Sequence, residues 1–421
     1  MGRSRRRIKW LLQPPHQAGV CHAYQVVRSH GIPDERIIVF MYDDLAYNDQ
    51  NPTPGIVVND LSGTDVYSGV PKDFTGEEVT PENFLKVLSG DGRLKADGKK
   101  VLESGPNDHV FISFTDHGAP GLVGFPADEL YARDLNNVLK DMHTENRCKK
   151  LVFYLEACES GSMFKNLLPD DIGIYAVTAA NERESSYATY WDDDRQAYVG
   201  DEFGVSWMED SDDHADLSGE TLDQQFVTVR KRTTQSHVQH YGDLSVAQLP
   251  VSEFQGSDIA KRVKRWRGGK KSVRRSGARE SVRGEDVPLV TAKRRAAANP
   301  HDPILRENYE TIVDGRTYVD ASRNLIGRKL IEAFGFPEEI LTERLLLTQH
   351  DCYQILVKSF KQNCFHLSTH SYALRSLFLL VNVCERLENT SQNVFGVESV
   401  ATLIADECRL SVNSHPFPAI V

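Results

Sequence analysis

The sequence predicts an α/β domain whose mostly parallel sheet is flanked by helices, followed by a basic linker and an all-α C-terminal domain. Over the first half of the chain, short β-branched and aromatic runs alternate with longer polar stretches. This pattern is typical of parallel strands that are buried on both faces and joined by helices. After residue 303 the apolar residues recur at helical spacing instead. We expect the α/β domain over residues 1–256, the linker over 257–302 and the helical domain over 303–421.

Four apolar runs account for the expected strands. They span residues 37–42, 110–115, 151–157 and 172–180. Ligand chemistry in parallel sheets gathers at the carboxyl ends of the strands. The residues that directly follow each run are therefore the candidates for a functional site.

The linker prediction rests on composition. Between Lys261 and Arg295 the sequence is rich in lysine, arginine, glycine and serine, so it cannot bury enough apolar surface to offset its ordering entropy. A nucleic-acid patch or a nuclear signal is an alternative interpretation. We favour an exposed, protease-sensitive segment.

The helical domain is predicted from two amphipathic faces. One face combines Val319, Ile326, Leu330 and Phe334, and the other combines Leu374, Leu377, Val381 and Cys384. Each set repeats at the three-to-four-residue spacing that places side chains on one side of a helix.

Charge and hydropathy exclude two classes of partner. The formal net charge is −11, which repels phosphate backbones, so we expect no nucleic-acid partner. No apolar run reaches the ~18 residues that a membrane helix needs, so we expect no membrane span. The apolar run 8–12 is short and interrupted by Lys9, so we see no export signal there.

The cysteines indicate an oxidising compartment, in disagreement with the lack of a visible export signal. Four of the seven crowd into the helical domain, at Cys352, Cys364, Cys384 and Cys408. This pattern predicts a disulfide-stapled module in an oxidising compartment, although sequence spacing alone leaves the pairing open. Asn389 begins an Asn-Thr-Ser glycosylation acceptor. We expect Cys21 and Cys148 to be buried thiols.

Two strand ends carry the residues that could perform chemistry. The run 110–115 leads directly into Asp116, His117 and Gly118, and the run 151–157 leads into Cys158. An ordinary thiol is almost fully protonated at neutral or acid pH, so a nucleophilic cysteine needs a facing base. The backbone N–H groups of Gly118 and Cys158 could stabilise an oxyanion. The alternative is a hydrogen-bonded loop histidine and a small buried cysteine.

The motifs around these residues resemble those of the legumain family, the asparaginyl endopeptidases also called vacuolar processing enzymes. The matching stretches include FTDHGAPG, YLEACESGSMF, TAANERESSYATY and HSYALRSLFLLVNVCE. The resemblance implies a caspase-like catalytic domain that uses no cofactor or metal. It implies that His117 is the general base, that Cys158 is the nucleophile, and that Asp116 is the residue that can form a succinimide beside them.

The same resemblance implies a pocket that selects asparagine. It places Glu156, Ser185 and Asp201 in this pocket and His16 at its mouth. An asparagine amide has two donors and one acceptor, so carboxylates together with a cation or hydroxyl suit it. Aspartate should enter only when protonated, near or below its ordinary pKa of ~3.9.

The N-terminus departs from the family pattern. In the family, a strand and loop precede the stretch that starts at His16, and they supply an asparagine that orients the catalytic histidine and an arginine that pairs with the pocket carboxylates. Here Gln13 could at best imitate the asparagine, and Pro15 carries no charge and cannot replace the arginine. We expect a raised pKa for Glu156 or Asp201, an incomplete first strand, and weak activity. A catalytically impaired form with a binding or regulatory role is the alternative function.

For the helical domain, the resemblance implies a prodomain that covers the active site of a zymogen. It pairs Cys352 with Cys384 and Cys364 with Cys408. Protonation of ion-paired carboxylates would release the prodomain at acid pH. Expected partners are this prodomain, protein and peptide substrates with asparagine before the cleaved bond, and cystatin-type inhibitors. The expected location is a lysosome or vacuole.

Activation requires cleavage near the linker. Asn299 lies there, but Pro300 follows it, and a peptide bond to proline is a poor substrate. Asn308 is the alternative processing point.

Overall fold

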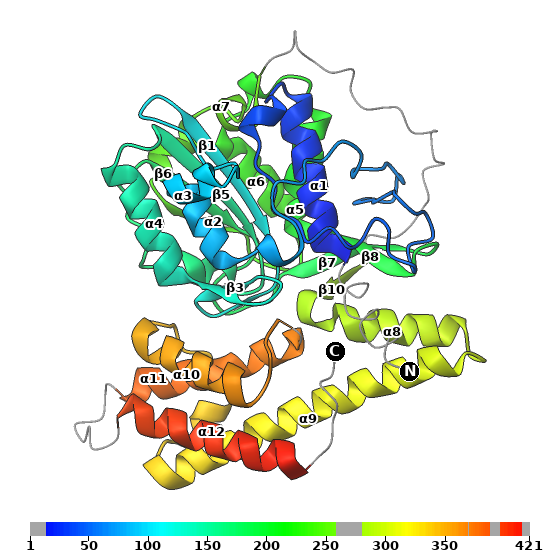
Figure 1. Ribbon diagram of the computed structural model, residues 1–421, viewed down its shortest axis with the longest axis vertical. Coiled ribbons are helices and arrows are strands. Elements are labelled where there is room, and N and C mark those ends of the chain that lie inside the picture. The colour runs from blue at the N-terminus through cyan, green and yellow to red at the C-terminus, as the bar shows by residue number, and fades with distance from the viewer. Residues whose placement is uncertain (1–13, 258–279, 369, 388–395, 415–421) are drawn as a thin grey trace.

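The computed structural model describes residues 14–257, 280–368, 370–387 and 396–414 (Figure 1). Its centre is a four-stranded sheet in the order β1 (His109–Thr115), β5 (Lys150–Glu156), β6 (Ile174–Thr178) and β9 (Gln239–Gly242). The first three strands are parallel, and β9 is antiparallel to β6. The mostly parallel sheet expected from the sequence is therefore present.

Helices cover both faces of this sheet (Figure 1). One face carries α1 (Pro14–Ser29), α5 (Glu202–Asp213) and α6 (Leu222–Arg232), and the other carries α2 (Pro81–Leu88) and α4 (Ala132–Thr144). Alternate residues of β5 point to opposite faces, as in any strand. Val152 and Tyr154 pack against α1, α5 and α6, whereas Leu151, Phe153 and Leu155 pack toward α2 and α4. This double burial explains the uninterrupted apolar run.

Smaller elements complete the α/β domain. Two antiparallel three-stranded sheets consist of β2 (Gly118–Ala119), β3 (Leu122–Gly124) and β4 (Glu129–Tyr131), and of β7 (Tyr187–Asp192), β8 (Ala197–Asp201) and β10 (Ser281–Arg283). The short helices are α3 (Gly92–Ala96) and α7 (Ser252–Gln255). The sequence pattern did not predict these short strands.

One expected strand does not join the sheet. The stretch 37–42 forms only an isolated parallel bridge, between Phe40 and Phe74. Three of the four predicted strands are therefore present, and the fourth is extended but has no ladder to β1 among the described residues. Apolar composition alone could not reveal this, because it reports burial rather than backbone pairing.

The linker prediction is wrong over its second half. Residues 258–279, which contain most of the basic stretch, lie outside the described residues. After them the chain folds: β10 pairs with β7, and α8 (Val287–Ala298) buries Val287 and Ala292. The guanidinium of Arg295 donates to the carbonyls of Gln196 and Arg195. Tertiary contacts thus order a segment whose composition favoured exposure.

The C-terminal domain is helical, as predicted. It contains α9 (Pro303–Phe334), α10 (His350–Asn363), α11 (Leu377–Leu387) and α12 (Val397–Ser414). Seven of the eight residues predicted on its two apolar faces are buried, and Phe334 is half-buried. No helix of the described chain is both long and apolar enough to cross a membrane.

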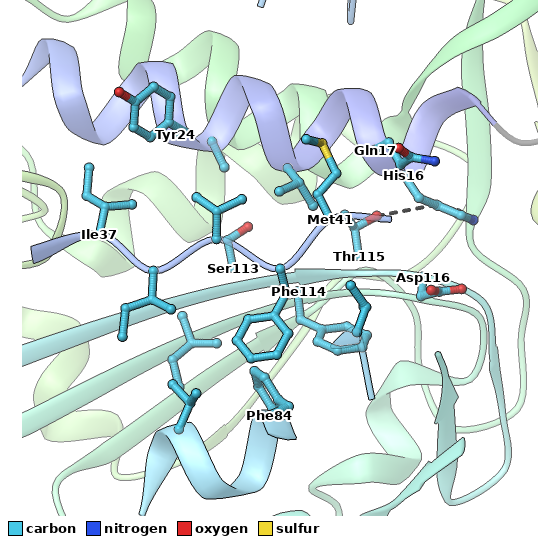
Figure 2. Close-up of a pocket in the computed structure, with 18 of the residues that line it drawn as sticks. His16, Gln17, Tyr24, Ile37, Met41, Phe84, Ser113, Phe114, Thr115 and Asp116 are labelled. Atoms are coloured by element: carbon cyan, nitrogen blue, oxygen red, sulfur yellow. Dashed lines mark hydrogen bonds between the residues drawn. The ribbon is translucent and has the colours of Figure 1, made fainter. Parts of the chain in front are cut away.

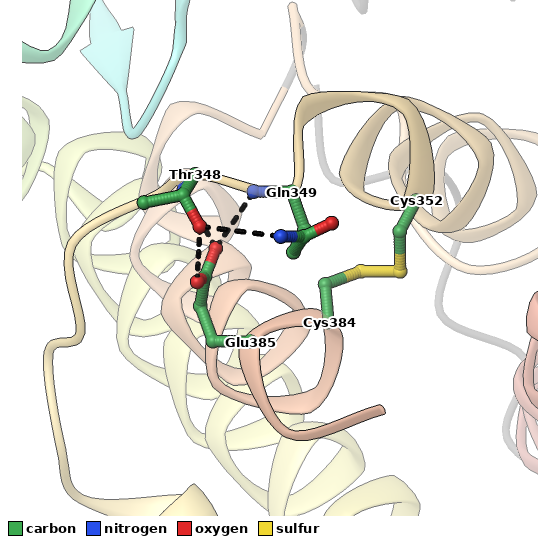
Figure 3. Close-up of a disulfide and its surroundings, with 5 residues drawn as sticks. All are labelled: Thr348, Gln349, Cys352, Cys384 and Glu385. Atoms are coloured by element: carbon green, nitrogen blue, oxygen red, sulfur yellow. Dashed lines mark hydrogen bonds between the residues drawn. A yellow bond between two sulfur atoms is a disulfide. The ribbon is translucent and has the colours of Figure 1, made fainter. Parts of the chain in front are cut away.

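Two cysteine pairs in this domain are at disulfide distance. Cys352 joins α10 to Cys384 of α11, with their Cα atoms 5.8 Å apart (Figure 3), and Cys364 pairs with Cys408, with Cα atoms 5.0 Å apart. These are the pairs that the family resemblance implied. Beside the first, the Glu385 carboxylate accepts hydrogen bonds from the start of α10. Asn389 lies outside the described residues.

The helical domain packs against one end of the α/β domain (Figure 1). Its hydrophobic core includes Ala119 and Leu122 from the hairpin that follows β1. Ion pairs surround this apolar contact: Arg133 pairs with Asp351, and Lys361 pairs with Asp128 at 2.7 Å and Glu129 at 2.8 Å. The hairpin therefore links the prodomain-like region to the strand end that carries His117.

Candidate active site

The pairing of β1 with β5 brings His117 and Cys158 to one edge of the sheet. Thr115 and Glu156 end these parallel strands in register, and the Asp116 N–H donates to the Glu156 carbonyl at 3.2 Å. His117 and Cys158 each follow two residues beyond these ends. A Cβ atom at position 118 would collide with the carbonyl oxygen of Cys158. Glycine is therefore required there, because the two loops approach closely.

The Cys158 thiol is buried and covered by residues 281–286, a segment that the sequence predicted to be exposed linker. We call these residues the covering segment. The thiol accepts a hydrogen bond from the Ser186 N–H at 3.3 Å and donates to the Glu285 carboxylate at 3.8 Å. A Cβ on Gly284 would lie 3.3 Å from the sulfur, so this residue also packs directly on the site. Burial raises the pKa of Cys158 well above its ordinary value, and the charges of Glu159 and Glu285 raise it further. The thiol is protonated in this arrangement.

His117 is held neutral by its surroundings. Burial lowers its pKa, and the positive charge of His16 lowers it further, to about 3. The rings of His16 and His117 are 4.9 Å apart and nearly perpendicular. Nε2 of His117 has no hydrogen-bond partner in the described part of the chain. A neutral imidazole with an unused nitrogen can accept a proton.

The residues expected in the asparagine pocket form a second cluster beside this pair. The Gly204 N–H, at the start of α5, donates to Glu156 at 2.8 Å. Burial raises the pKa of Glu156 well above its ordinary value, and the Asp201 charge raises it further. A raised pKa was expected for one of these carboxylates, and it is found at Glu156.

His16 supplies a positive charge to this cluster. Its Nδ1 lies 3.1 Å from an Asp201 oxygen and 3.3 Å from the Thr115 hydroxyl. Burial lowers the pKa of His16, but the Asp201 charge and hydrogen bond outweigh this effect and raise it to about 9. His16 is therefore a cation at neutral pH, rather than only a residue at the mouth of the pocket.

Ser185, which was also expected in the asparagine pocket, contacts the segment that covers the thiol. Its hydroxyl donates to the Glu285 carboxylate at 2.6 Å, so Glu285 contacts both Ser185 and the Cys158 thiol. The Gly284 N–H donates to the Ser186 carbonyl at 2.9 Å, which continues the antiparallel pairing of β10 with β7. The strand β10 and the 3₁₀ turn that follows it (Gly284–Asp286) thus lie along the site. Their only sequence signal was a Gly-Glu-Asp interruption in basic surroundings.

Comparison with known proteins agrees with this geometry. The Peptidase C13 family model matches residues 15–257, and the model described as legumain, prodomain matches residues 307–399. The chain belongs to the Peptidase C13 family. Legumain of Rattus norvegicus is 47% identical over 379 residues, covering 88% of this chain and 85% of the rat protein. The vacuolar-processing enzyme of Citrus sinensis is 39% identical over 425 residues, covering 96% and 84%.

A third relative is similar over most of the chain. The hemoglobinase of Schistosoma japonicum is 42% identical over 388 residues, covering 91% of this chain and 88% of that protein. The chain is therefore a C13 cysteine endopeptidase that carries a prodomain. Proteins are its substrates.

Burial and neighbouring charges also shift the pKa of Asp116. Burial raises its pKa to about 6, although the His16 charge and the His117 backbone N–H, which donates at 2.6 Å, both oppose this rise. Asp116, His16 and His117 each offer one possible metal-ligand atom within 4.8 Å of the others. His16 already holds a proton against Asp201, so a cation would have to displace that proton to bind.

Proposed function

We propose that this C13 peptidase cleaves peptide bonds after asparagine, and after aspartate at acid pH, and that it is made as a zymogen. The observation that carries the proposal is the arrangement at one sheet edge. A thiol and a neutral imidazole follow adjacent strand ends, and a pocket with both carboxylates and a cation lies beside them. Family resemblance supports the individual residue roles.

The proposed chemistry follows from these groups. His117 would take the proton from the Cys158 thiol as the sulfur attacks the scissile carbonyl carbon, and would then protonate the leaving amine. The N–H groups of Gly118 and Cys158 would stabilise the oxyanion. Water would then hydrolyse the thioester, with His117 again accepting a proton.

Specificity would come from the neighbouring cluster. The amide NH₂ of asparagine can donate to Asp201 and Glu156, and its oxygen can accept from Ser185 or His16. A buried pocket that makes these bonds rejects side chains that leave its groups unpaired. An aspartate side chain can imitate the amide only when protonated, since its charged form would face two carboxylates.

The covering segment would make the uncleaved chain latent. Glu285 accepts from Ser185, where the substrate amide would bind, and Gly284 packs on the nucleophile. The segment is anchored from the helical domain, because Arg316 of α9 pairs with Asp286 at 2.6 Å and also donates to the Glu285 carbonyl. Cleavage must therefore separate this segment from the site. Asn299 is exposed between α8 and α9 but is followed by Pro300, which disfavours cleavage there, whereas Asn308 lies within α9 and would need local unfolding to be cut.

An acidic lysosome or vacuole is the proposed location, in agreement with the disulfide-stapled domain and the vacuolar name of one relative. Cystatin-type inhibitors remain a proposed class of partner on family grounds. We propose no nucleic-acid partner, because the formal net charge of −11 repels phosphate backbones.

The decisive experiment measures fluorophore release from matched asparaginyl, aspartyl and glutaminyl reporters at pH ~5 after acid treatment. Cys158→Ala should abolish release, whereas Cys148→Ala, which removes a half-buried thiol outside the site, should not. Equal turnover of the glutaminyl reporter would contradict the proposed pocket.

A second candidate is the catalytically impaired form with a binding or regulatory role. It is motivated by the N-terminal departure, since the family's orienting asparagine and pocket arginine have no counterpart. If this alternative holds, the 421-residue chain should release little fluorophore, and grafting the family's N-terminal stretch should restore release. Equal activity of the two forms would exclude it.

A further inference from the structure

Residues 179–186 connect β6 to β7 and carry two of the residues that make up the site. We call them the pocket loop. Ser185 was expected in the asparagine pocket, and the Ser186 N–H donates to the Cys158 thiol at 3.3 Å. A loop lacks the regular backbone hydrogen bonds of a helix or a sheet, so contacts with other segments must fix the position of these two serines.

Helical and strand residues form another part of the pocket. His16 lies in the first turn of α1, and its Nδ1 is 3.3 Å from the Thr115 hydroxyl at the end of β1 (Figure 2). Regular secondary structure fixes the backbone of both residues. The pocket loop is therefore the part of the site whose position needs a separate explanation.

The Glu184 carboxylate collects three hydrogen bonds within and around the pocket loop. One oxygen accepts from the Asn181 N–H at 3.0 Å and from the His237 N–H at 2.8 Å. The other oxygen accepts from Nδ1 of His237 at 2.8 Å. In addition, the Glu184 carbonyl accepts from the Glu159 N–H at 2.8 Å. Glu184 therefore ties the loop to the segment before β9 and to the residue that follows Cys158.

The exposure of this pair indicates what the contact can do. The Glu184 side chain is 24% exposed and that of His237 is 70% exposed. A contact between charged side chains this exposed contributes only ~0–1 kcal/mol to stability. Hydrogen bonds from backbone N–H groups to a carboxylate are nevertheless short and directional, so they restrict the conformation of a loop. The contact is thus suited to fixing the loop rather than to stabilising the fold.

In the covered state the pocket loop has further contacts. Arg344 of the helical domain donates to the Arg183 carbonyl at 2.6 Å, and Ser185 donates to Glu285 of the covering segment at 2.6 Å. Both contacts are lost when the covering segment and the helical domain leave. The contacts of Glu184 lie wholly within the α/β domain, so they remain.

We propose that Glu184 is a positioning residue of this peptidase, which with His237 holds the pocket loop in place once the covering segment has left. Glu184 touches neither the substrate nor the thiol. It keeps Ser185 in the pocket and the Ser186 N–H beside the sulfur. The expected effect on substrate binding rests on the proposed function, whereas the expected effect on the thiol does not.

Steady-state kinetics of the processed protein tests the effect on substrate binding. Glu184→Ala should lower kcat/KM for an asparaginyl reporter ~10-fold or more, with a rise in KM because Ser185 is displaced. Loss of folded protein would lower kcat alone. Glu184→Gln keeps an acceptor oxygen and should retain more activity than Glu184→Ala. An unchanged KM in Glu184→Ala would overturn the proposal.

The matched control is Glu253→Ala. It removes a glutamate–histidine pair of the same kind, with His109 at 3.0 Å, at the amino end of β1. This end of the strand is opposite to the end that leads to His117. Glu253→Ala should therefore leave both kcat and KM unchanged, and an equal loss in both variants would show that the effect of Glu184 is only structural.

The partner is tested by a double-variant cycle. His237→Ala should lower kcat/KM less than Glu184→Ala, because the backbone N–H at position 237 can still donate. The double variant should be hardly worse than Glu184→Ala alone, since the two side chains act through one contact. Additive losses would show that Glu184 does not act with His237.

Alkylation of Cys158 by iodoacetamide tests the proposal without any substrate. In the processed protein, Glu184→Ala should slow alkylation ~3-fold or more, because the Ser186 N–H that stabilises the thiolate is displaced. In the intact chain the difference should be smaller, because Arg344 and Glu285 still hold the loop. Equal rates for Glu184→Ala and the parent in the processed protein would overturn the proposal. Failure of the parent to cleave the asparaginyl reporter would instead contradict the proposed function.

Discussion

Cys158 and His117 lie beside Asp201 and His16, but the two pairs have opposite electrostatic states. Burial raises the pKa of the Cys158 thiol and lowers that of His117 to about 3, so the candidate catalytic pair is neutral. In the pocket, the close contact with Asp201 outweighs burial and raises the pKa of His16 to about 9. The difference follows from the neighbours: a hydrogen-bonded partner of opposite charge can offset desolvation, whereas a buried group beside charges of the same sign as its own ionised form stays neutral.

This comparison indicates which half of the site is preformed. The pocket holds its charges in the covered state, whereas the thiol has no cationic partner among the described residues and faces carboxylates instead. Removing the covering segment would take one of those carboxylates away. Activation would therefore change the catalytic pair more than the pocket.

The largest effect is expected at the catalytic pair. Cys158→Ala and His117→Ala should each reduce asparaginyl cleavage by roughly 10⁴-fold or more, and the double variant should be hardly worse, because the two residues act as one unit. Single-turnover kinetics on the processed protein measures this. Additive losses would show that the two side chains act separately.

The contact between His16 and Asp201 should make the free energy of unfolding fall at alkaline pH. The pKa of His16 in the folded state, about 9, lies above its ordinary value of 6.5. Its stabilising contribution is therefore complete below pH ~6.5 and is lost as pH rises toward 9, an effect on the order of 2–3 kcal/mol. Denaturant unfolding from pH 6 to 9 measures it. His16→Gln should flatten this dependence. If His16 were not paired with Asp201, the parent and the variant would give parallel curves.

The covering segment should control thiol reactivity in the intact chain. Glu285→Ala removes a carboxylate and opens the site, so the apparent pKa of Cys158 should fall and its alkylation rate should rise ~10-fold or more. Iodoacetamide labelling across pH measures both quantities. Glu280→Ala, which removes an exposed acid directly before this segment, is the control. Equal labelling of both variants would mean that Glu285 does not govern the thiol.

The smallest effect concerns acid release of the helical domain, where two neighbouring carboxylates act in opposite directions. Burial raises the pKa of Glu129 to about 7, so its protonation at acid pH favours the covered state, despite the Lys361 contact. Partial burial opposes ionisation of Asp128, but the hydrogen bonds from Lys361 and the Glu129 N–H, together with the Lys361 charge, outweigh it and lower the pKa of Asp128. The stabilising contribution of Asp128 is present above its ordinary pKa of ~3.9 and is lost as pH falls through its lower folded value.

Asp128→Asn should therefore weaken the domain contact slightly above pH ~4 and leave it unchanged at lower pH. Glu129→Gln should have the opposite sign and strengthen the contact at neutral pH. Size-exclusion chromatography of the processed protein across pH measures the separation. If Glu129→Gln weakened the contact and Asp128→Asn did not, this assignment would be wrong.

Several features could be predicted from the sequence because they depend on local pattern. The side chains of residues 110–115 and 151–157 point alternately to the two covered faces of the sheet, and this produced the apolar runs that identified β1 and β5. Parallel strands place their carboxyl ends together, so His117 and Cys158 were predicted to be neighbours. The amphipathic faces of the helical domain were visible for the same reason.

Other features depended on contacts between distant residues. The composition of residues 280–298 favoured exposure, but pairing of β10 with β7 and the fit of Gly284 against Cys158 order this segment. The pairing state of residues 37–42 is likewise invisible in their apolar composition. The sequence by itself determined which residues become buried and which strand ends carry reactive groups, because these follow local periodicity. Only the tertiary structure decided which group faces which, because hydrogen bonds and pKa shifts depend on distances of a few ångströms between segments far apart in the chain.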